Sequence, residues 1–100
     1  MISSYPACFV KDGDGYSVVF PDFENVATCG DTLEEAELMA ADLLAGYLLW
    51  LEEEGDLIPN PSSEEQVNVS EILKLLDIDE TEVFVKMVSV DVKEYAKEHF

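Results

Sequence analysis

The chain has 100 residues, 23 of them acidic and only 5 basic, which gives a formal net charge of -18 at pH 7. This length fits one domain. A surface so acidic repels phosphate backbones, which argues against direct nucleic-acid binding. No run of about 20 apolar residues is present, so a membrane span is excluded. The N-terminal residues do not resemble a signal peptide, and we therefore expect a cytoplasmic protein.

The charge also predicts attraction to a basic partner, because an acidic surface raises the rate at which such a partner associates. The alternative is that the acidic residues only keep a small domain soluble, because that role would give the same composition. Every charged residue between Lys11 and Lys74 is Asp or Glu. The acidic excess is therefore concentrated in the middle of the chain.

The cysteines and the histidine predict no metal or cofactor. Cys8 and Cys29 lie in apolar, strand-like segments, so we expect both thiols to be buried and leave their redox state open. Neither cysteine has metal-ligand spacing to another, and His99 is the only histidine. A zinc site is not supported.

The first 54 residues predict a hairpin, a third strand and one long helix. Asp12–Gly15 contains two glycines and two aspartates, which predicts a four-residue hairpin loop. Pro21 ends the second strand, because it cannot donate a ladder hydrogen bond. The predicted strands are residues 5–11, 16–20 and 26–29.

The long helix has a start signal, a stop signal and one apolar face. Asp31 with Glu34, or Thr32 with Glu35, fits the capping-box spacing, and Gly55 provides a C-terminal cap. Apolar residues recur at steps of three and four and should lie on the sheet. These residues are Leu33, Ala36, Ala40, Leu43, Leu44, Tyr47, Leu48 and Leu51.

A second, narrower apolar strip lies on roughly the opposite side of this helix. It consists of Leu38, Ala45 and Leu49, with Glu35 and Asp42 beside it. An exposed apolar strip with charged edges suggests contact with another chain. The helix also contains Gly46, where a second backbone could come close.

The rest of the chain predicts a polar connection over residues 55–82, a last strand over 83–92 and a short C-terminal helix over 93–100. Within the connection, Ser70 is expected to cap a short helix, Glu71–Leu76. These elements predict one α/β (α+β) domain over residues 1–100, in the order β-β-β-α-β, without a separate DNA-binding domain. A right-handed crossover would place the last strand in a small mixed sheet.

Four carboxylates of the loops raise the question of metal-dependent catalysis. Asp12, Asp14, Asp22 and Glu24 lie in two neighbouring loops and could gather around a divalent ion. The segment from Asp12 fails the calcium-loop pattern, because Tyr16 occupies its fifth position. Turn residues on a solvated edge, partner contacts and metal ligands are the three alternatives. No nucleophile–base pair is visible, and we expect no enzyme activity.

An ordered set of short motifs resembles the HicB antitoxin family. The match covers about the first sixty residues well and the Val85–Tyr95 stretch more loosely. Its motifs are Tyr5-Pro6-Ala7, Lys11-Asp12-Gly13-Asp14-Gly15-Tyr16, Phe20-Pro21-Asp22-Phe23 and Thr28-Cys29-Gly30-Asp31-Thr32-Leu33-Glu34-Glu35-Ala36. Residues 23–26 depart from the family, which commonly has Leu-Pro-Gly-Cys there.

This resemblance implies a partial RNase H-like fold and a function by binding. Family members pair with a small basic HicA toxin, an RNA-cleaving protein with a catalytic histidine, and block its access to RNA. Many members also carry a C-terminal DNA-binding domain, and this chain has no basic segment after its last predicted strand. An orphan oligomeric interaction module and a metal-dependent nuclease are the alternatives.

Two surfaces are candidates for binding the toxin. The first is the set of loops with Asp12, Asp14, Asp22, Phe23 and Glu24. The second is the outer helix strip with Glu35, Leu38, Asp42 and Leu49. We also expect a homodimer or tetramer, because the second strip and the sheet edges need covering.

Overall fold

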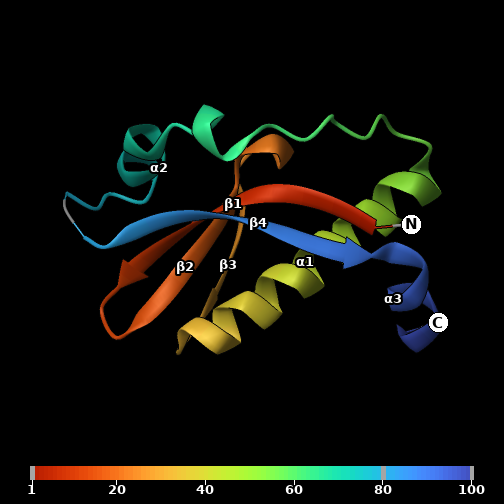
Figure 1. The fold of residues 1–100 in the computed structure, drawn as a ribbon, viewed down its shortest axis with the longest axis horizontal. Coiled ribbons are helices and arrows are strands. Elements are labelled where there is room, and N and C mark those ends of the chain that lie inside the picture. The colour runs from red at the N-terminus through yellow and green to blue at the C-terminus, as the bar shows by residue number, and fades with distance from the viewer. Residues whose placement is uncertain (1, 80, 100) are drawn as a thin grey trace.

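The computed structural model describes residues 2–79 and 81–99. It is an α+β fold with one long helix on a four-stranded sheet, which confirms the predicted fold class (Figure 1). Two short 3-10 turns, η1 and η2, interrupt the connections. The elements are β1 (Ile2–Asp12), β2 (Gly15–Phe20), η1 (Pro21–Phe23), β3 (Val26–Gly30), α1 (Leu33–Glu54), η2 (Glu64–Gln66), α2 (Val69–Leu75), β4 (Val83–Asp91) and α3 (Val92–His99).

The sheet has the order β3-β2-β1-β4, and all three pairings are antiparallel. The prediction of a mixed sheet is therefore wrong. α1 runs to the end of the sheet where the N-terminus lies, and residues 55–68 bring the chain back to α2 at the other end (Figure 1). β4 consequently starts where β1 finishes and runs against it. A strand that followed α1 directly would have run parallel to β1.

The β1–β2 hairpin has a tighter turn than predicted. Asp12 pairs with Gly15, so only Gly13 and Asp14 form the loop. Gly13 has a φ of 62°, a left-handed conformation that glycine adopts without a steric penalty. Each of the two strands therefore gains a residue that had been assigned to the loop.

The predicted caps of the long helix are confirmed, and the alternative at its start is decided. The Oγ1 of Thr32 accepts a hydrogen bond from the backbone N–H of Glu35, at 3.1 Å. Gly55 follows the helix with a φ of 70°, and its N–H bonds to the carbonyl of Glu52.

The short helix α2 differs from the prediction, because Asn68 caps it in place of Ser70. The Asn68 side chain accepts from the N–H of Glu71.

Alternate residues of the sheet face two separate cores, as the two-residue period of a strand requires. Phe9, Val18 and Phe20 pack with the buried face of α1. On the other face, α2 covers the sheet through Ile72. The residues beneath α2 are Cys8, Val10 and Val19.

The prediction for the cysteines is half right. Cys8 is buried, but Cys29 is exposed, because it lies on the outer strand β3 and points away from the core. β2 separates the two cysteines in the sheet, and strands lie about 4.8 Å apart. That separation is too large for a disulfide within one chain. Both thiols are free.

Most of the apolar face predicted for α1 is buried in this arrangement. Ala36, Ala40, Leu44, Leu48 and Leu51 are buried, and Leu44 and Leu48 are among the largest fully enclosed side chains. Burying an aliphatic side chain of this size contributes about 1.5–3 kcal/mol. The outer members of the predicted face are less covered: Leu43 and Tyr47 are half-buried, and Leu33 is exposed.

Candidate partner-binding surface

The carboxylates of the two predicted acidic loops lie at opposite ends of the sheet. Asp12 and Asp14 lie at the β1–β2 turn, whereas Asp22 and Glu24 lie at and just after η1. The six residues of β2 separate these turns, a span of about 20 Å at 3.3 Å per residue. The idea that the four carboxylates gather is therefore wrong. Within the described residues, no cluster of His, Cys, Asp or Glu is arranged to hold a metal ion.

Asp22 has a structural role that the sequence did not reveal. Its two carboxylate oxygens accept hydrogen bonds from the backbone N–H and the hydroxyl of Ser62, at 2.8 and 2.7 Å. The neighbouring Phe23 is buried, with 4% of its surface exposed. Asp22 therefore attaches the connection after α1 to η1. Among the candidate partner-binding residues at and after η1, Glu24 remains exposed; its backbone is left-handed, with a φ of 55°.

Tyr5 attaches the same connection at a second point. Its hydroxyl donates to the carbonyl of Pro59, at 2.5 Å. Burial, and secondarily the negative charge of Asp22, raises the pKa of Tyr5 above its ordinary value. The hydroxyl therefore keeps its proton and remains a donor across the physiological pH range.

The outer strip predicted on α1 is divided by the chain's own C-terminal helix. Leu38 is 67% exposed, and Glu35 and Asp42 are also exposed. Ala45 is buried, and Leu49 is half-buried beside α3. Part of the strip assigned to another chain is thus covered within this one. A shallow groove of about 310 Å³ remains; it is lined by Leu38, Ala41, Asp42, Ala45, Val90, Asp91, Glu94 and Tyr95.

Tyr95 of α3 explains why a glycine is present in the middle of α1. A Cβ built on Gly46 would lie 3.3 Å from the Tyr95 hydroxyl oxygen, so the glycine admits this ring closely. Burial, together with the charge of Asp42 and a hydrogen bond to it, raises the pKa of Tyr95. Gly46 therefore accommodates a side chain of the same molecule, whereas the sequence suggested a second backbone.

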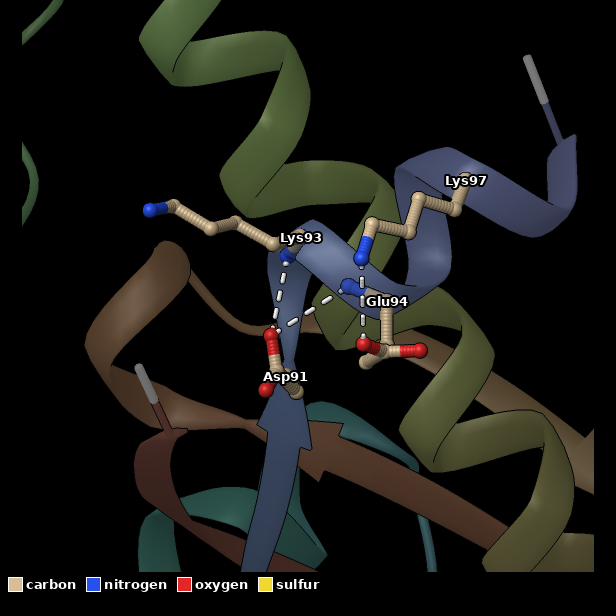
Figure 2. Close-up of polar contacts among 4 residues, drawn as sticks. All are labelled: Asp91, Lys93, Glu94 and Lys97. Carbon is tan, nitrogen blue, oxygen red and sulfur yellow. Dashed lines mark hydrogen bonds and ion pairs between the residues drawn. The ribbon is translucent and has the colours of Figure 1, made fainter.

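The start of α3 is fixed by a side-chain cap (Figure 2). The Oδ1 of Asp91 accepts hydrogen bonds from the backbone N–H groups of Glu94 and Lys93, at 3.2 and 3.1 Å. These bonds, chiefly the one from Glu94, lower the pKa of Asp91. One turn on, Lys97 lies 3.5 Å from the carboxylate of Glu94. Asp91 and the Glu94–Lys97 pair thus hold the first turns of α3.

The other flank of α1 carries an apolar stripe that sequence reasoning missed. Met39, Leu43, Tyr47 and Trp50 follow one another at steps of four, four and three, which places them on one helix face. Trp50 is 50% exposed and Met39 is 41% exposed. The spacing was available in the sequence. Leu43 and Tyr47, however, were assigned entirely to the core face, which hid the stripe.

A chain of aromatic contacts joins this stripe to the core. The ring of Phe23 lies 4.6 Å from that of Tyr5 and 5.2 Å from that of Tyr47, measured between centroids. Tyr47 in turn meets Trp50 edge to face at 5.7 Å. A cavity of about 240 Å³ lies beside Tyr47; it is lined by Asp22, Phe23, Glu24, Tyr47, Leu51, Leu57 and Pro59.

No helix formed by the described residues is both long and apolar enough to cross a membrane. α1 is long enough at 22 residues, but carboxylates occur along its length. An exposed apolar and aromatic patch on a helix with charged neighbours is typical of a protein-binding surface. The geometry therefore indicates a protein that acts by binding another protein.

Comparison with solved structures gives two similar folds. One is a chain of a toxin–antitoxin complex from Streptococcus pneumoniae, at a TM-score of 0.82 and 33% identity, over 95% of this chain and 73% of that one. The other is a chain of a HicA3 and HicB3 toxin–antitoxin complex, at a TM-score of 0.66 and 22% identity, over 89% of this chain and 99% of that one. At that identity the second likeness shows the fold alone.

Two relatives are similar in sequence. A 14.9 kDa protein from the rep–hol intergenic region of Haemophilus phage HP1 is 31% identical over 93 residues, which are 88% of this chain and 70% of the relative. Antitoxin HicB 2 of Photorhabdus laumondii is 42% identical over 59 residues, which are 59% of this chain. The match spans 42% of that antitoxin's length.

Residues 4–76 match the family described as HicB_like antitoxin of bacterial toxin–antitoxin systems. This match covers most of the chain, from β1 through α2, and thus most residues of both cores and the whole aromatic stripe. It agrees with the resemblance drawn from the motifs of the first sixty residues. The chain belongs to the HicB_like antitoxin family.

Proposed function

We propose that this chain neutralises a small basic ribonuclease toxin of the HicA type by binding it and covering its RNA-binding surface. The observation that carries the proposal is the likeness to a chain of the pneumococcal toxin–antitoxin complex, over 95% of this chain at 33% identity. The charge supports it, because a protein of net charge -18 complements a basic partner.

The same proposal assigns the chain no catalysis, no cofactor and no direct contact with nucleic acid. Its support is the separation of the loop carboxylates across β2 and the scarcity of basic residues.

We place the protein in the cytoplasm, where the RNA substrates of such a toxin are found. A homodimer or tetramer is part of the proposal, supported by β3 and β4, the outer strands of the sheet.

Co-expression tests this function directly. The probe is the small basic protein encoded next to this chain's gene, produced from an inducible promoter with and without the chain. We expect the chain to restore growth and to co-purify with the toxin at low salt. Binding should weaken as salt rises, because part of the attraction is electrostatic. Absence of both a complex and growth rescue would contradict the proposal.

A further inference from the structure

One side of α1 presents large apolar side chains that the described chain covers only in part. We define the aromatic surface as Met39, Leu43, Tyr47 and Trp50 of α1, with Leu57 of the segment that follows. Trp50 is half exposed, and Leu57 is 95% exposed. Leu57 and Tyr47 line the same cavity of about 240 Å³. Large apolar side chains exposed together in this way favour contact with another protein.

The aromatic surface is held in place before any partner arrives. Tyr47 packs on Phe23, and through Phe23 one end of the ring chain leads into the core. The segment that carries Leu57 is attached through Pro59 to Tyr5 and through Ser62 to Asp22. A surface ordered in advance loses little conformational entropy on binding. Trp50 and its neighbours are therefore suited to be anchors.

The charged residues in the stretch that carries the aromatic surface are all negative. No basic residue occurs between Lys11 and Lys74, and the whole surface lies within that stretch. Glu53, Glu54 and Asp56 come three, four and six positions after Trp50, and all three are exposed. The opposite flank of α1, beside β4 and α3, differs in having lysines nearby. Those lysines are Lys86, Lys93 and Lys97.

We propose that the aromatic surface is where the basic toxin docks, with Trp50 as the central anchor and the surrounding carboxylates attracting the toxin's cations. This rests on the proposed function and names its site. A second copy of this chain is a poorer occupant, because it would bring another net charge of -18 against the same carboxylates. Tryptophan and tyrosine are the residues that most often dominate binding energy at protein interfaces.

The test compares two flanks of the same helix. Trp50→Ala and Leu57→Ala remove side chains of the aromatic surface, whereas Leu38→Ala removes a leucine that is 67% exposed on the other flank. Affinity for the toxin from the co-expression assay is measured by calorimetry. We expect Trp50→Ala to weaken binding at least about 30-fold, the effect of an interface anchor. Leu57→Ala should weaken it several-fold, and Leu38→Ala should leave it within about twofold.

The outcomes separate this inference from the proposed function. If the wild-type chain binds the toxin but Trp50→Ala and Leu57→Ala bind equally well, the docking site is wrong and the function stands. If the wild-type chain does not bind, the function fails as well. Loss of self-association in Trp50→Ala, with toxin binding unchanged, would assign the surface to a second copy and overturn the proposal. Leu57 is so exposed that its truncation cannot act through misfolding.

Discussion

The two flanks of α1 carry similar apolar side chains but differ in what covers them. On one flank, Ala45 and Leu49 lie under α3, and Tyr95 closes over Gly46. On the other, Met39 and Trp50 remain open to solvent. Apolar periodicity thus identifies a helix face that is suited to burial. Which element covers that face, if any, is seen only in the tertiary structure.

The charges differ between the flanks as well. On the flank beside β4 and α3, Glu94 pairs with Lys97, and Glu37 pairs with Lys86 at 2.7 Å. After Trp50, the exposed carboxylates of Glu53, Glu54 and Asp56 form no ion pair with another described residue. Unpaired carboxylates near an exposed aromatic side chain gain more from a basic partner than carboxylates whose charges are already paired. The comparison therefore favours the open flank as the binding side.

The largest expected effect comes from the buried face that the two flanks share. Leu44 is 1% exposed, so Leu44→Ala should leave a cavity and lower the free energy of unfolding by about 2–5 kcal/mol. Urea unfolding followed by circular dichroism measures the change. A loss below about 1 kcal/mol would show that α1 is not packed on the sheet as described.

A smaller effect is expected on the covered flank. Tyr95→Ala removes the ring that closes over Gly46 and should lower the free energy of unfolding by roughly 1–2 kcal/mol. Trp50→Ala, on the open flank, should cost about 0.5–1 kcal/mol, because it loses mainly the contact with Tyr47. The same unfolding assay compares the two. A reversed order would mean that the open flank contributes more to folding than the covered one.

The smallest effect concerns the cap that positions α3. Asp91 has a lowered pKa in the folded state, so its charge stabilises the fold above its unfolded pKa of about 3.9. That contribution is lost as the pH falls through the lower folded value. The wild type should therefore be more stable than Asp91→Asn at pH 6, and the difference should shrink towards pH 2. Urea midpoints across this range measure it; a difference independent of pH would contradict the role of the charge.

Local sequence signals predicted most of the elements, because caps and periodicity act over a few residues. Thr32 caps the start of the long helix and Gly55 caps its end, at positions that the sequence indicated. The direction of β4 was not predictable in this way, since it depends on the path of the whole connection between α1 and β4. Asp22 and Ser62, which attach that connection, are forty positions apart in the sequence. No local sequence pattern predicts their hydrogen bonds.

The candidate site was predicted less well, for a related reason. Leu38 and Asp42 were placed correctly on an exposed part of α1, but Leu49 was partly covered once α3 was in place. Trp50 did not fit the core stripe and received no role. Its exposure, and its contact with Tyr47, became visible only with the structure. Whether a residue at the edge of an apolar stripe is buried depends on elements far along the chain.

Trp50 also offers the most direct measurement, because it is the only tryptophan in the chain. The chain labelled with 5-fluorotryptophan should give a single ¹⁹F resonance from this position, and the unlabelled toxin remains invisible. On titration with the toxin, we predict that the resonance shifts and becomes protected from solvent, in step with complex formation seen by size exclusion. A complex that forms while the resonance stays unchanged would contradict the assignment of the open flank of α1 as the binding surface.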